Sequence, residues 1–344
     1  MSCGHSQDLV AFVTGDASTG KALVNGGVDK IIFIGSPGNG KRVMEAAAAT
    51  LTPVTLELGG KDPMIICDDA DLNTIVPIAM RGVFQNMGQN CIGIERIYCA
   101  ANLYEDFCAR VGRIANEMRQ GLPLEVASDC GALVMPAQID IVDRLVKEAI
   151  SKGARVLAGG ERNAALSPGQ FYKPTVLCNV DHSMRIVHEE VFGPVMLIIK
   201  TNSDDDAVRM ANDSKYALAG SVFSNSRDRA FKIARQVQGG TVLVNDFGIA
   251  YLCQELPFGG VGFSGFGKFN GPEGLRECCN QKVLMNDRFS FLKSQIPKPL
   301  QYPVSPNAVG GARLILNIIY GAGVARKMGA IKQFVKMLVG RQAK

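Results

Sequence analysis

The sequence contains no tryptophan, and only three of its 344 residues are histidines. Its ten cysteines include no C-x-x-C pair, which argues against a structural zinc site. No apolar run approaches the ~18–20 residues that span a bilayer, and the first residues have neither the basic nor the apolar segment of a signal peptide. We therefore expect no metal, reduced and mostly buried thiols, and a reducing compartment on the cytoplasmic side.

Acidic residues are absent from 288–344, where ten lysines and arginines lie. The other residues carry 27 basic and 32 acidic side chains, a net charge of −5, whereas the whole chain carries +5. All of the excess positive charge therefore belongs to the C-terminal tail. A basic tail on a mildly acidic body favours an anionic partner for the tail, and we expect no nucleic-acid partner.

The tail has two parts of different composition. Four prolines, at positions 297, 299, 303 and 306, predict an extended connector. Within 313–344, lysine and arginine occupy some helical faces and apolar residues recur on another, which predicts a basic amphipathic helix. Such a helix either docks on its own protein or binds an anionic membrane surface, and both interpretations stay open. The recurring apolar residues are Tyr320, Val324, Met328, Ile331, Val335 and Leu338.

Apolar runs alternate with helix-forming segments from the beginning of the chain. Residues 9–13 and 28–35 have the pattern of strands, and each precedes a glycine turn and a predicted helix, at 15–23 and 37–49. This order predicts an α/β fold with a parallel sheet covered by helices. Two such units are fewer than a nucleotide-binding sheet normally has, so we expect only part of such a sheet.

The alternation continues to residue 245. We predict helices at 72–87, 102–121, 138–152, 204–214 and 227–237, and strands at 64–67, 94–100, 155–157, 175–177, 195–200, 219–223 and 240–245. The following segment 258–267, F-G-G-V-G-F-S-G-F-G, has five glycines in ten residues. We predict a loop whose backbone packs closely against a ligand or another segment.

A cysteine on a turn is the first candidate for chemistry. Cys91 follows Gly88-Gln89-Asn90, which end the helix predicted at 72–87, and apolar residues resume after it. A thiol on such a turn is open to a substrate. It needs local donors or positive charge to ionise, which we expect from backbone N–H groups and Arg96. The alternative is a buried structural cysteine.

A single carboxylate, Glu57, lies 34 residues before the cysteine. It ends an apolar stretch and precedes Leu58-Gly59-Gly60, whose glycines permit a sharp turn and leave room for a ligand. A buried carboxylate is costly unless it is paired or useful, and a raised pKa would suit a general base for water. The alternative is a salt bridge from Glu57 to Lys61 or Arg96. A thiol and a carboxylate are the groups that covalent catalysis on a carbonyl requires.

These two segments resemble known signatures. L-E-L-G-G-K-D-P at 56–63 and F-Q-N-M-G-Q-N-C-I-G-I-E-R at 84–96 are similar to the glutamate and cysteine signatures of the aldehyde dehydrogenase superfamily. The combination is specific, because further landmarks follow in family order over about residues 9–287. They are F-I-G-S at 33–36 with Gly40, E-E-V-F-G-P at 189–194, Y-A-L at 216–218, V-N at 244–245 and P-F-G-G at 257–260.

The resemblance implies roles for individual residues. Cys91 would be the nucleophile, and Glu57 would activate water against the resulting thioester. The F-I-G-S turn would lie against the pyrophosphate of NAD or NADP, and Glu190 would hold the nicotinamide ribose. The residues implied at the cofactor are Gly35, Ser36, Gly40, Leu58, Glu190 and Phe192, with Phe258 in the substrate pocket.

The implied activity is the NAD(P)-dependent oxidation of an aldehyde to a carboxylate through a Cys91 thiohemiacetal. Details at 51–57, 88–91, 257–262 and 296–304 resemble the plant and fungal family-22 branch, which is associated with membranes of the secretory pathway. For a full-length form, the resemblance therefore implies peripheral contact with, or anchoring at, the endoplasmic reticulum or another secretory membrane. These residues determine neither the particular aldehyde nor the choice between NAD and NADP.

The resemblance also suggests boundaries along the chain. Residues 1–58 would form a partial NAD(P)-binding domain, 59–262 a complete α/β catalytic domain, 263–287 a return to the cofactor and oligomerisation region, and 288–344 the connector and basic tail. Family members carry more of the cofactor domain before the segment that opens this chain, so we expect a C-terminal part of such an enzyme. The alternative function is a catalytically impaired, membrane-associated or oligomerising module. A strand at 282–285 resembles the family's intersubunit strand and suggests a homodimer.

Overall fold

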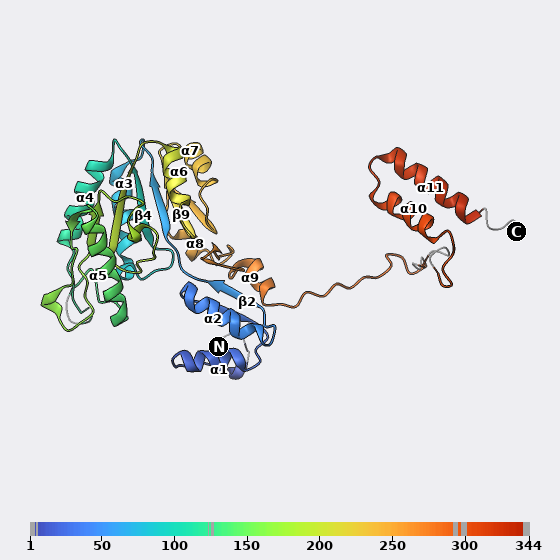
Figure 1. Ribbon diagram of the computed structural model, residues 1–344, viewed down its shortest axis with the longest axis horizontal. Coiled ribbons are helices and arrows are strands. Elements are labelled where there is room, and N and C mark those ends of the chain that lie inside the picture. The colour runs from blue at the N-terminus through green and yellow to red at the C-terminus, as the bar shows by residue number, and fades with distance from the viewer. Residues whose placement is uncertain are drawn as a thin grey trace. The chain divides into compact units, whose positions relative to one another are not determined.

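The computed structural model describes residues 4, 6–122, 124, 127–291, 295–296 and 301–339 of the chain. They belong to two units, 1–280 and 281–344, and each is described by itself (Figure 1). Among the described residues every strand lies in the first unit, and two helices lie in the second. The finer domain boundaries at 58, 262 and 287 stay predictions.

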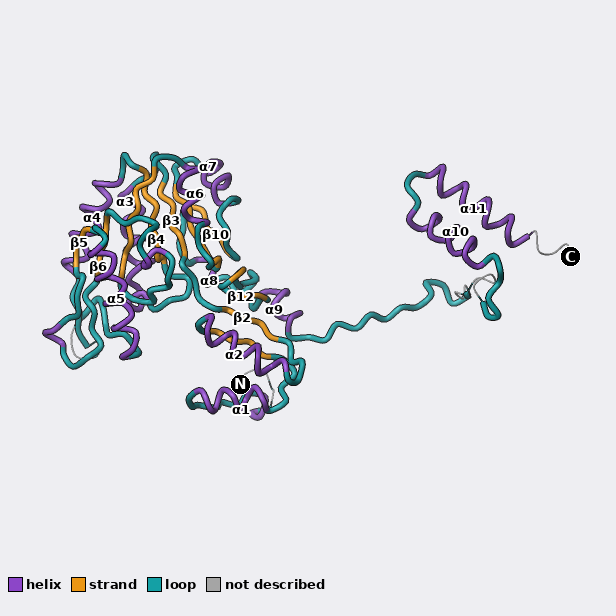
Figure 2. The backbone as a smooth tube through the Cα atoms, viewed as in Figure 1, coloured by secondary structure: helices purple, strands orange, loops and turns teal. Residues whose placement is uncertain are grey.

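Seven strands form the central sheet of the first unit (Figure 2). Their order is β10-β9-β3-β4-β7-β6-β5, and all neighbours run parallel except β5 and β6. Parallel neighbours require crossover connections, which are mostly helices here. The strands are β3 (Asp62–Ile66), β4 (Ile94–Ala100), β5 (Arg155–Ala158), β6 (Thr175–Cys178), β7 (Val195–Thr201), β9 (Ala219–Phe223) and β10 (Thr241–Val244).

Helices cover both faces of this sheet. One face packs against α3 (Leu72–Phe84) and α4 (Tyr104–Glu117), and the other against α5 (Pro136–Ser151), α6 (Asp204–Asn212) and α7 (Arg227–Ala234). The predicted strands and helices of this region are all confirmed, with their ends shifted by a few residues. Short elements complete it: η2 (Gln85–Gly88), η3 (Ala164–Leu166), η4 (Arg185–Val187), α8 (Ile249–Leu252) and α9 (Gly271–Glu277).

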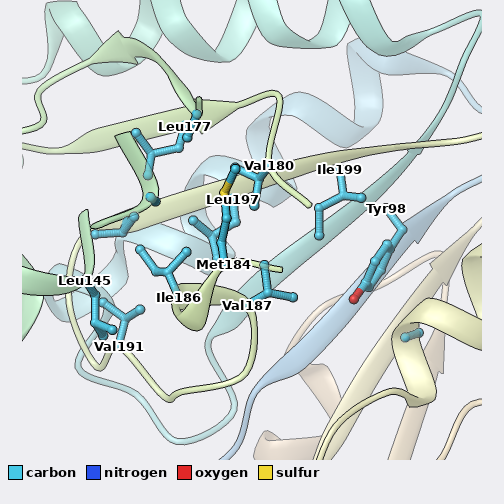
Figure 3. Close-up of a cluster of buried hydrophobic side chains, with 14 of the residues drawn as sticks. Tyr98, Leu145, Leu177, Val180, Met184, Ile186, Val187, Val191, Leu197 and Ile199 are labelled. Carbon is cyan, nitrogen blue, oxygen red and sulfur yellow. The ribbon is translucent and has the colours of Figure 1, made fainter. Parts of the chain in front are cut away.

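The two faces of the sheet hold separate buried clusters. Ile97 and Cys99 of β4 belong to the cluster beneath α3 and α4, whereas Tyr98 belongs to the cluster on the opposite face. Figure 3 shows part of this second cluster, in which Ile199 of β7 lies beside Tyr98. Because successive side chains alternate between two buried faces, the strands have nearly continuous apolar sequences.

A smaller sheet has the order β1-β2-β12, with β1 (Ile31–Ile34) parallel to β2 (Val54–Glu57) and β12 (Gly265–Phe266) antiparallel to β2. The helix α2 (Pro37–Ala48) connects β1 to β2, and α1 (Ala17–Asn25) precedes β1. The strand predicted at 9–13 is wrong, and the segment starts with a single-turn helix, η1 (Gln7–Leu9). A strand needs a hydrogen-bonded neighbour, and these apolar side chains remain in solvent; Phe12 is 92% exposed.

The glycine-rich segment 258–267 packs closely against another segment, as predicted, but it is not wholly a loop. It contains the two-residue strands β11 (Val261–Gly262), which pairs with β8 (Tyr216–Ala217), and β12, where Gly265 lies opposite Glu57. Gly265 has a φ of +99°, and a β-carbon there would lie 2.0 Å from the Leu56 carbonyl oxygen. Only glycine fits where this segment crosses β2.

The second unit contains α10 (Ala308–Tyr320) and α11 (Val324–Val339), which pack against each other. The single helix predicted within 313–344 is therefore two helices, because Gly321 and Gly323 separate them and Gly323 has a φ of +79°. No helix of the described residues is both long enough and apolar enough to cross a membrane. Part of the predicted connector, 297–300, and the tail end 340–344 lie outside the described residues.

Residues 282–285 do not form the predicted strand. Leu284 and Met285 are 82% and 93% exposed, and within the described part of the chain no strand pairs with them. A strand that joins two subunits forms only when the second subunit supplies its hydrogen-bond partners. The prediction therefore fails for one chain taken alone.

Candidate active site

Glu57 is the last residue of β2 and lies at the carboxyl end of the parallel pair β1–β2, where open α/β sheets bind ligands. The residue is 1% exposed, and neither carboxylate oxygen has a hydrogen-bond partner among the described residues. Burial raises the pKa of this carboxyl, and the nearby Cys91 thiol and Gly59 N–H oppose the shift only in part. An unpartnered buried carboxyl is costly for stability, which indicates a functional role.

The turn before Cys91 has an unusual backbone. The helix α3 ends at Phe84, earlier than predicted, and Asn86, Met87 and Gly88 then adopt positive φ angles of +52°, +60° and +69°. Residues other than glycine rarely adopt this conformation, so the turn is strained. A β-carbon on Gly88 would lie 2.1 Å from the Gly193 carbonyl oxygen. Glycine at position 88 therefore lets the E-E-V-F-G-P segment approach the turn closely.

A second turn presents Cys91 itself. The Gly93 N–H donates to the Asn90 carbonyl oxygen at 2.9 Å, and the Ile92 N–H donates to Asn90 Oδ1 at 3.4 Å. Cys91 Sγ lies 4.0 Å from the same Oδ1 atom. Cys91 is half-buried, whereas five other cysteines are fully buried: Cys67, Cys99, Cys108, Cys130 and Cys178. Cys91 therefore lies on a turn, as predicted, and is less buried than these five cysteines.

The electrostatics of Cys91 differ from the prediction. Burial, followed by the Glu57 carboxylate, raises the pKa of the Cys91 thiol above its ordinary range. The Arg96 guanidinium is committed elsewhere, because it donates to the Lys61 carbonyl oxygen and the Tyr98 hydroxyl, both at 2.8–2.9 Å. The prediction that Arg96 ionises the thiol is therefore wrong. The alternative of a salt bridge from Glu57 to Lys61 or Arg96 is wrong too.

Four of the predicted cofactor residues gather at the end of β1 and β2. The Gly35 N–H donates to the Glu57 carbonyl oxygen at 3.0 Å, and Ser36 caps the N-terminus of α2 with its Oγ. Free N–H groups and the helix dipole make such a terminus suitable for a phosphate. Gly40 lies against Leu58, since a β-carbon there would be 2.4 Å from Leu58 Cδ2.

Glu190 and Phe192 belong to the segment before β7, which lies against the residues that follow β2. Glu190 Oε1 accepts the Gly60 N–H at 3.0 Å. A β-carbon on Gly59, whose φ is +78°, would lie 2.2 Å from that oxygen. Burial raises the pKa of Glu190 to about 8. Phe192 has a φ of +45°, and its N–H donates to Glu95 at 2.9 Å. Glu190 is thus bonded to the segment that follows Glu57, and Phe192 to Glu95 of β4.

Phe258 supplies an apolar wall beside the thiol. It is 5% exposed, and its ring lies 5.1 Å from that of Phe269 between centroids. A separate hollow of about 890 Å³ includes Met87 and Gln89 in its lining, but neither Cys91 nor Glu57. The cluster around Phe258 consists of Ile92, Leu218, Ala219 and Phe258, with Cys91 and Phe269 packed against it.

Three buried charged residues near the site were not predicted from the sequence: Lys61, Asp62 and Glu95. Lys61 forms an ion pair with Glu95, and Asp62 Oδ1 accepts the Ala219 N–H at 3.1 Å. Burial raises the pKa of Asp62 well above its ordinary value. One signal was available in I-E-R-I at 94–97, because charges inside an apolar strand are buried only when they have partners.

One group of side chains has the composition of a metal site. Among the described residues, His182, His188 and Asp213 each offer a ligand atom within 4.8 Å of the others. Three of the four histidine ring nitrogens already have hydrogen-bond partners, however. His182 Nδ1 pairs with Asp213 at 2.8 Å and Nε2 with the Tyr98 hydroxyl at 3.1 Å, and His188 Nε2 pairs with the His182 carbonyl oxygen. A hydrogen-bond network around Tyr98 accounts for the group.

A half-buried thiol, an unpartnered carboxyl and a helix N-terminus thus lie at the edge of an α/β sheet. The sequence profile of the aldehyde dehydrogenase family matches residues 1–284, and the chain belongs to this family. An aldehyde dehydrogenase-like protein of Schizosaccharomyces pombe is 39% identical over 329 residues, which cover 94% of this chain and 63% of the relative. A similar protein of Saccharomyces cerevisiae is 40% identical over 89% of this chain and 49% of its own length.

Solved structures agree with this assignment. An aldehyde dehydrogenase of Mycobacterium tuberculosis complexed with NAD+ superimposes with a TM-score of 0.76 and 37% identity, over 80% of this chain and 57% of that one. A betaine aldehyde dehydrogenase of Staphylococcus aureus in complex with NAD+ gives a TM-score of 0.71 and 35% identity, over 75% and 52%. The chain spans roughly half to two thirds of the length of the curated relatives it matches.

Proposed function

We propose that this chain takes part in the NAD(P)-dependent oxidation of an aldehyde to a carboxylate. The observation that carries the proposal is the unpartnered, 1% exposed Glu57 carboxyl beside the half-buried Cys91 thiol. The Gly35 N–H donates a hydrogen bond to the Glu57 carbonyl oxygen. This bond links Glu57 to the F-I-G-S turn at 33–36, which is the proposed phosphate-binding turn. The aldehyde, the thioester formed on Cys91 and the cofactor would then all lie at the carboxyl end of β1 and β2.

The residues present fit a nicotinamide dinucleotide. Gly35 and Ser36 offer the N-terminus of α2 to a pyrophosphate, with Gly40 and Leu58 packed beneath it. The Glu190 carboxylate would accept hydrogen bonds from the hydroxyl groups of a ribose, and Phe192 would lie beside the nicotinamide. When bound, the cofactor supplies the hydride acceptor. The solved relatives with NAD+ support this assignment, while one relative is named as a succinate-semialdehyde dehydrogenase that uses NADP+.

The chain's own residues perform the remaining steps. Cys91 Sγ, after losing its proton, bonds to the aldehyde carbon and gives a thiohemiacetal. The Cys91 N–H donates a hydrogen bond to the oxygen that gains negative charge. After loss of hydride the cysteine carries a thioester. Glu57 then takes a proton from water, the resulting hydroxide attacks the thioester carbon, and the carboxylate leaves as the thiol re-forms. The presence of Glu57 favours hydrolysis over acyl transfer to coenzyme A.

The substrate class is an aldehyde, and the relatives do not narrow it. Their names include a succinate-semialdehyde dehydrogenase and a betaine aldehyde dehydrogenase, which act on an anion and a cation respectively. Phe258 makes one wall of the pocket apolar, which suits the alkyl part of either substrate.

Two measurements on the full chain test this proposal. Equilibrium dialysis should detect NAD or NADP binding, and NADH or NADPH formation should follow addition of short or long aldehydes. Cys91→Ser should lower turnover at least ~10³-fold because the hydroxyl is a poor nucleophile, whereas the exposed Cys253→Ser should match the wild type. Unchanged turnover in Cys91→Ser would refute the proposed role.

A second proposed function concerns the tail, as a module that binds anionic membrane surfaces from the cytoplasmic side. Ten basic and no acidic residues lie in 288–344. Val309 and Tyr320 of α10 and Val324 and Met328 of α11 are 59–79% exposed, so apolar side chains are available at the surface of this basic unit. Basic charge with exposed apolar side chains is the combination that binds a lipid surface.

Vesicle co-sedimentation tests the membrane proposal. The full chain should pellet with phosphatidylserine vesicles, less with neutral ones, and less as salt rises. Replacing Lys327, Lys332 and Lys336 with glutamine should weaken binding by about 1 kcal/mol per charge. Equal binding to neutral vesicles, or none to either, would reject it.

We also propose that 282–285 joins two copies of the chain. The support is the exposure of Val283, Leu284 and Met285, each above 80%, together with the resemblance to an intersubunit strand. Analytical ultracentrifugation should give a dimer, and Leu284→Lys should shift the population to monomer. A monomeric wild type at high concentration would remove this proposal.

A further inference from the structure

Lys61 and Glu95 form an ion pair inside the protein. Their side chains are 0% and 8% exposed. Lys61 follows Gly59 and Gly60, and Glu95 lies four residues after Cys91 on β4. Two buried charges are worth their desolvation cost only when they have good partners, and replacing such a pair with apolar groups often does not reduce stability. A contribution to stability therefore does not explain why this ion pair is buried here.

Glu95 has more partners than Lys61. Its Oε2 accepts the Val191 N–H at 2.9 Å, and its Oε1 accepts the Phe192 N–H at 2.9 Å. Phe192 has a φ of +45°, a conformation that is costly for a bulky residue. Hydrogen bonds from a carboxylate to two successive N–H groups hold the backbone in this conformation.

The neighbouring residue is fixed by the same arrangement. Glu190 directly precedes Val191, and its Oε1 accepts the Gly60 N–H at 3.0 Å. Gly60 directly precedes Lys61, the cation that pairs with Glu95. Two connections therefore join residues 59–61 to residues 190–192: one from Gly60 to Glu190, and one from Lys61 through Glu95 to Val191 and Phe192. The second connection passes entirely through buried charged groups.

We propose that the Lys61–Glu95 pair is a positioning device that sets the placement of Glu190 and Phe192 relative to Gly59 and Gly60. It acts through these residues and touches no reacting atom itself. The inference rests on the proposed function, because Glu190 and Phe192 are the residues assigned there to the ribose and nicotinamide. It gives this buried pair a role in addition to those proposed above for Cys91 and Glu57.

Three variants of the full chain test the proposal: Glu95→Gln, Lys61→Met, and the two together. Glu95→Gln keeps the shape and one acceptor oxygen but loses the charge. The double variant removes the unpaired lysine that the single variant leaves buried, so it should fold even where Glu95→Gln does not. The exposed Lys200→Met on β7 serves as the control.

Hydrogen exchange of peptides measures the positioning directly. In Glu95→Gln and in the double variant, the amides of 189–194 should exchange about tenfold faster, which is the size of one charge-assisted hydrogen bond. The amides of α7, which lies outside the segment 189–194, should exchange at the wild-type rate. The dissociation constant for NAD should rise about tenfold in the same variants, with little change in the alkylation rate of Cys91.

The outcomes separate this inference from the proposed function. If the folded Glu95→Gln and double variants exchange and bind as the wild type does, or if exchange accelerates equally in α7, the positioning role is refuted. If the wild-type chain binds no NAD, the proposed function fails for the isolated chain. The exchange of 189–194 then still decides whether the pair positions this segment.

Discussion

Burial is the main cause of the raised pKa of both Cys91 and Glu57. Burial disfavours the charged form of each group, and the Glu57 carboxylate further raises the pKa of the thiol. A thiol that stays protonated at neutral pH is protected from unwanted alkylation and oxidation. Ionisation of the thiol therefore requires a change in the electrostatics of the site.

Glu57→Gln should make Cys91 more reactive toward iodoacetamide at pH 8. Removing a nearby negative charge lowers the pKa of the thiol, and a shift of one unit corresponds to about tenfold more thiolate. Mass spectrometry after timed labelling measures the rate, and the exposed Cys253, Cys278 and Cys279 provide an internal control in the same sample. A slower rate in the variant would mean that Glu57 assists ionisation of the thiol in the resting site.

The same substitution should change how stability depends on pH. Because the pKa of Glu57 is raised in the folded state, folding retains a proton that the unfolded chain releases. The contribution to stability is therefore complete below the ordinary value of 4.5 and is lost as pH rises through the raised pKa. The stability of Glu57→Gln relative to wild type should increase from pH 4 to pH 8. Urea unfolding at several pH values measures it, with the exposed Glu45→Gln as the control variant.

At the level of elements, the strained turn after α3 has a direct mutational test. Gly88→Ala should destabilise the protein by about 2–4 kcal/mol, since it combines a positive φ of +69° with a β-carbon 2.1 Å from the Gly193 carbonyl oxygen. Gly20→Ala in the exposed face of α1, with no atom within 4 Å, should be neutral or stabilise by up to about 1 kcal/mol. Denaturant unfolding compares the two. Equal effects would contradict the steric explanation.

The alternating strands and helices of 62–244 were predictable because most of the strands are largely apolar, and strands such as β7 and β9 are buried on both faces. The same rule fails at 9–13, where an apolar run is 64–92% exposed at Leu9, Val10, Phe12 and Val13. Apolar composition shows that a strand is favourable, but pairing depends on a neighbour that the local sequence does not reveal. The break between α10 and α11 was missed because two glycines interrupt a pattern that otherwise continues at helical spacing.

For the site, Cys91 and Glu57 could be predicted because their surroundings are local in sequence. Asn90 and Gly93 turn the chain at the thiol, and Gly59 turns it after the carboxyl. The partners of Arg96 could not be predicted, since the carbonyl of Met210 comes from more than 100 residues away. The role of Glu95 depends in the same way on Val191, which only the folded sheet brings near.

For the whole molecule, the two units differ in how they are stabilised. All three buried clusters of the described residues belong to 1–280. In the second unit, by contrast, most apolar side chains of α10 and α11 are exposed, and Gly311 and Ala330 are among the few buried residues. The sequence left two interpretations of the tail, docking on its own protein or binding a partner.

Deleting 288–344 distinguishes these two interpretations. If the first unit is stable on its own clusters, its melting temperature should change by less than about 2 °C, which corresponds to less than ~1 kcal/mol for a unit of this size. The net charge should fall from +5 to −5, so retention on a cation exchanger at pH 7 and binding to anionic vesicles should both be lost. Calorimetry, chromatography and co-sedimentation measure the three effects on one preparation. A drop of more than about 5 °C, with vesicle binding absent in both forms, would show instead that the basic helices stabilise the first unit by docking on it.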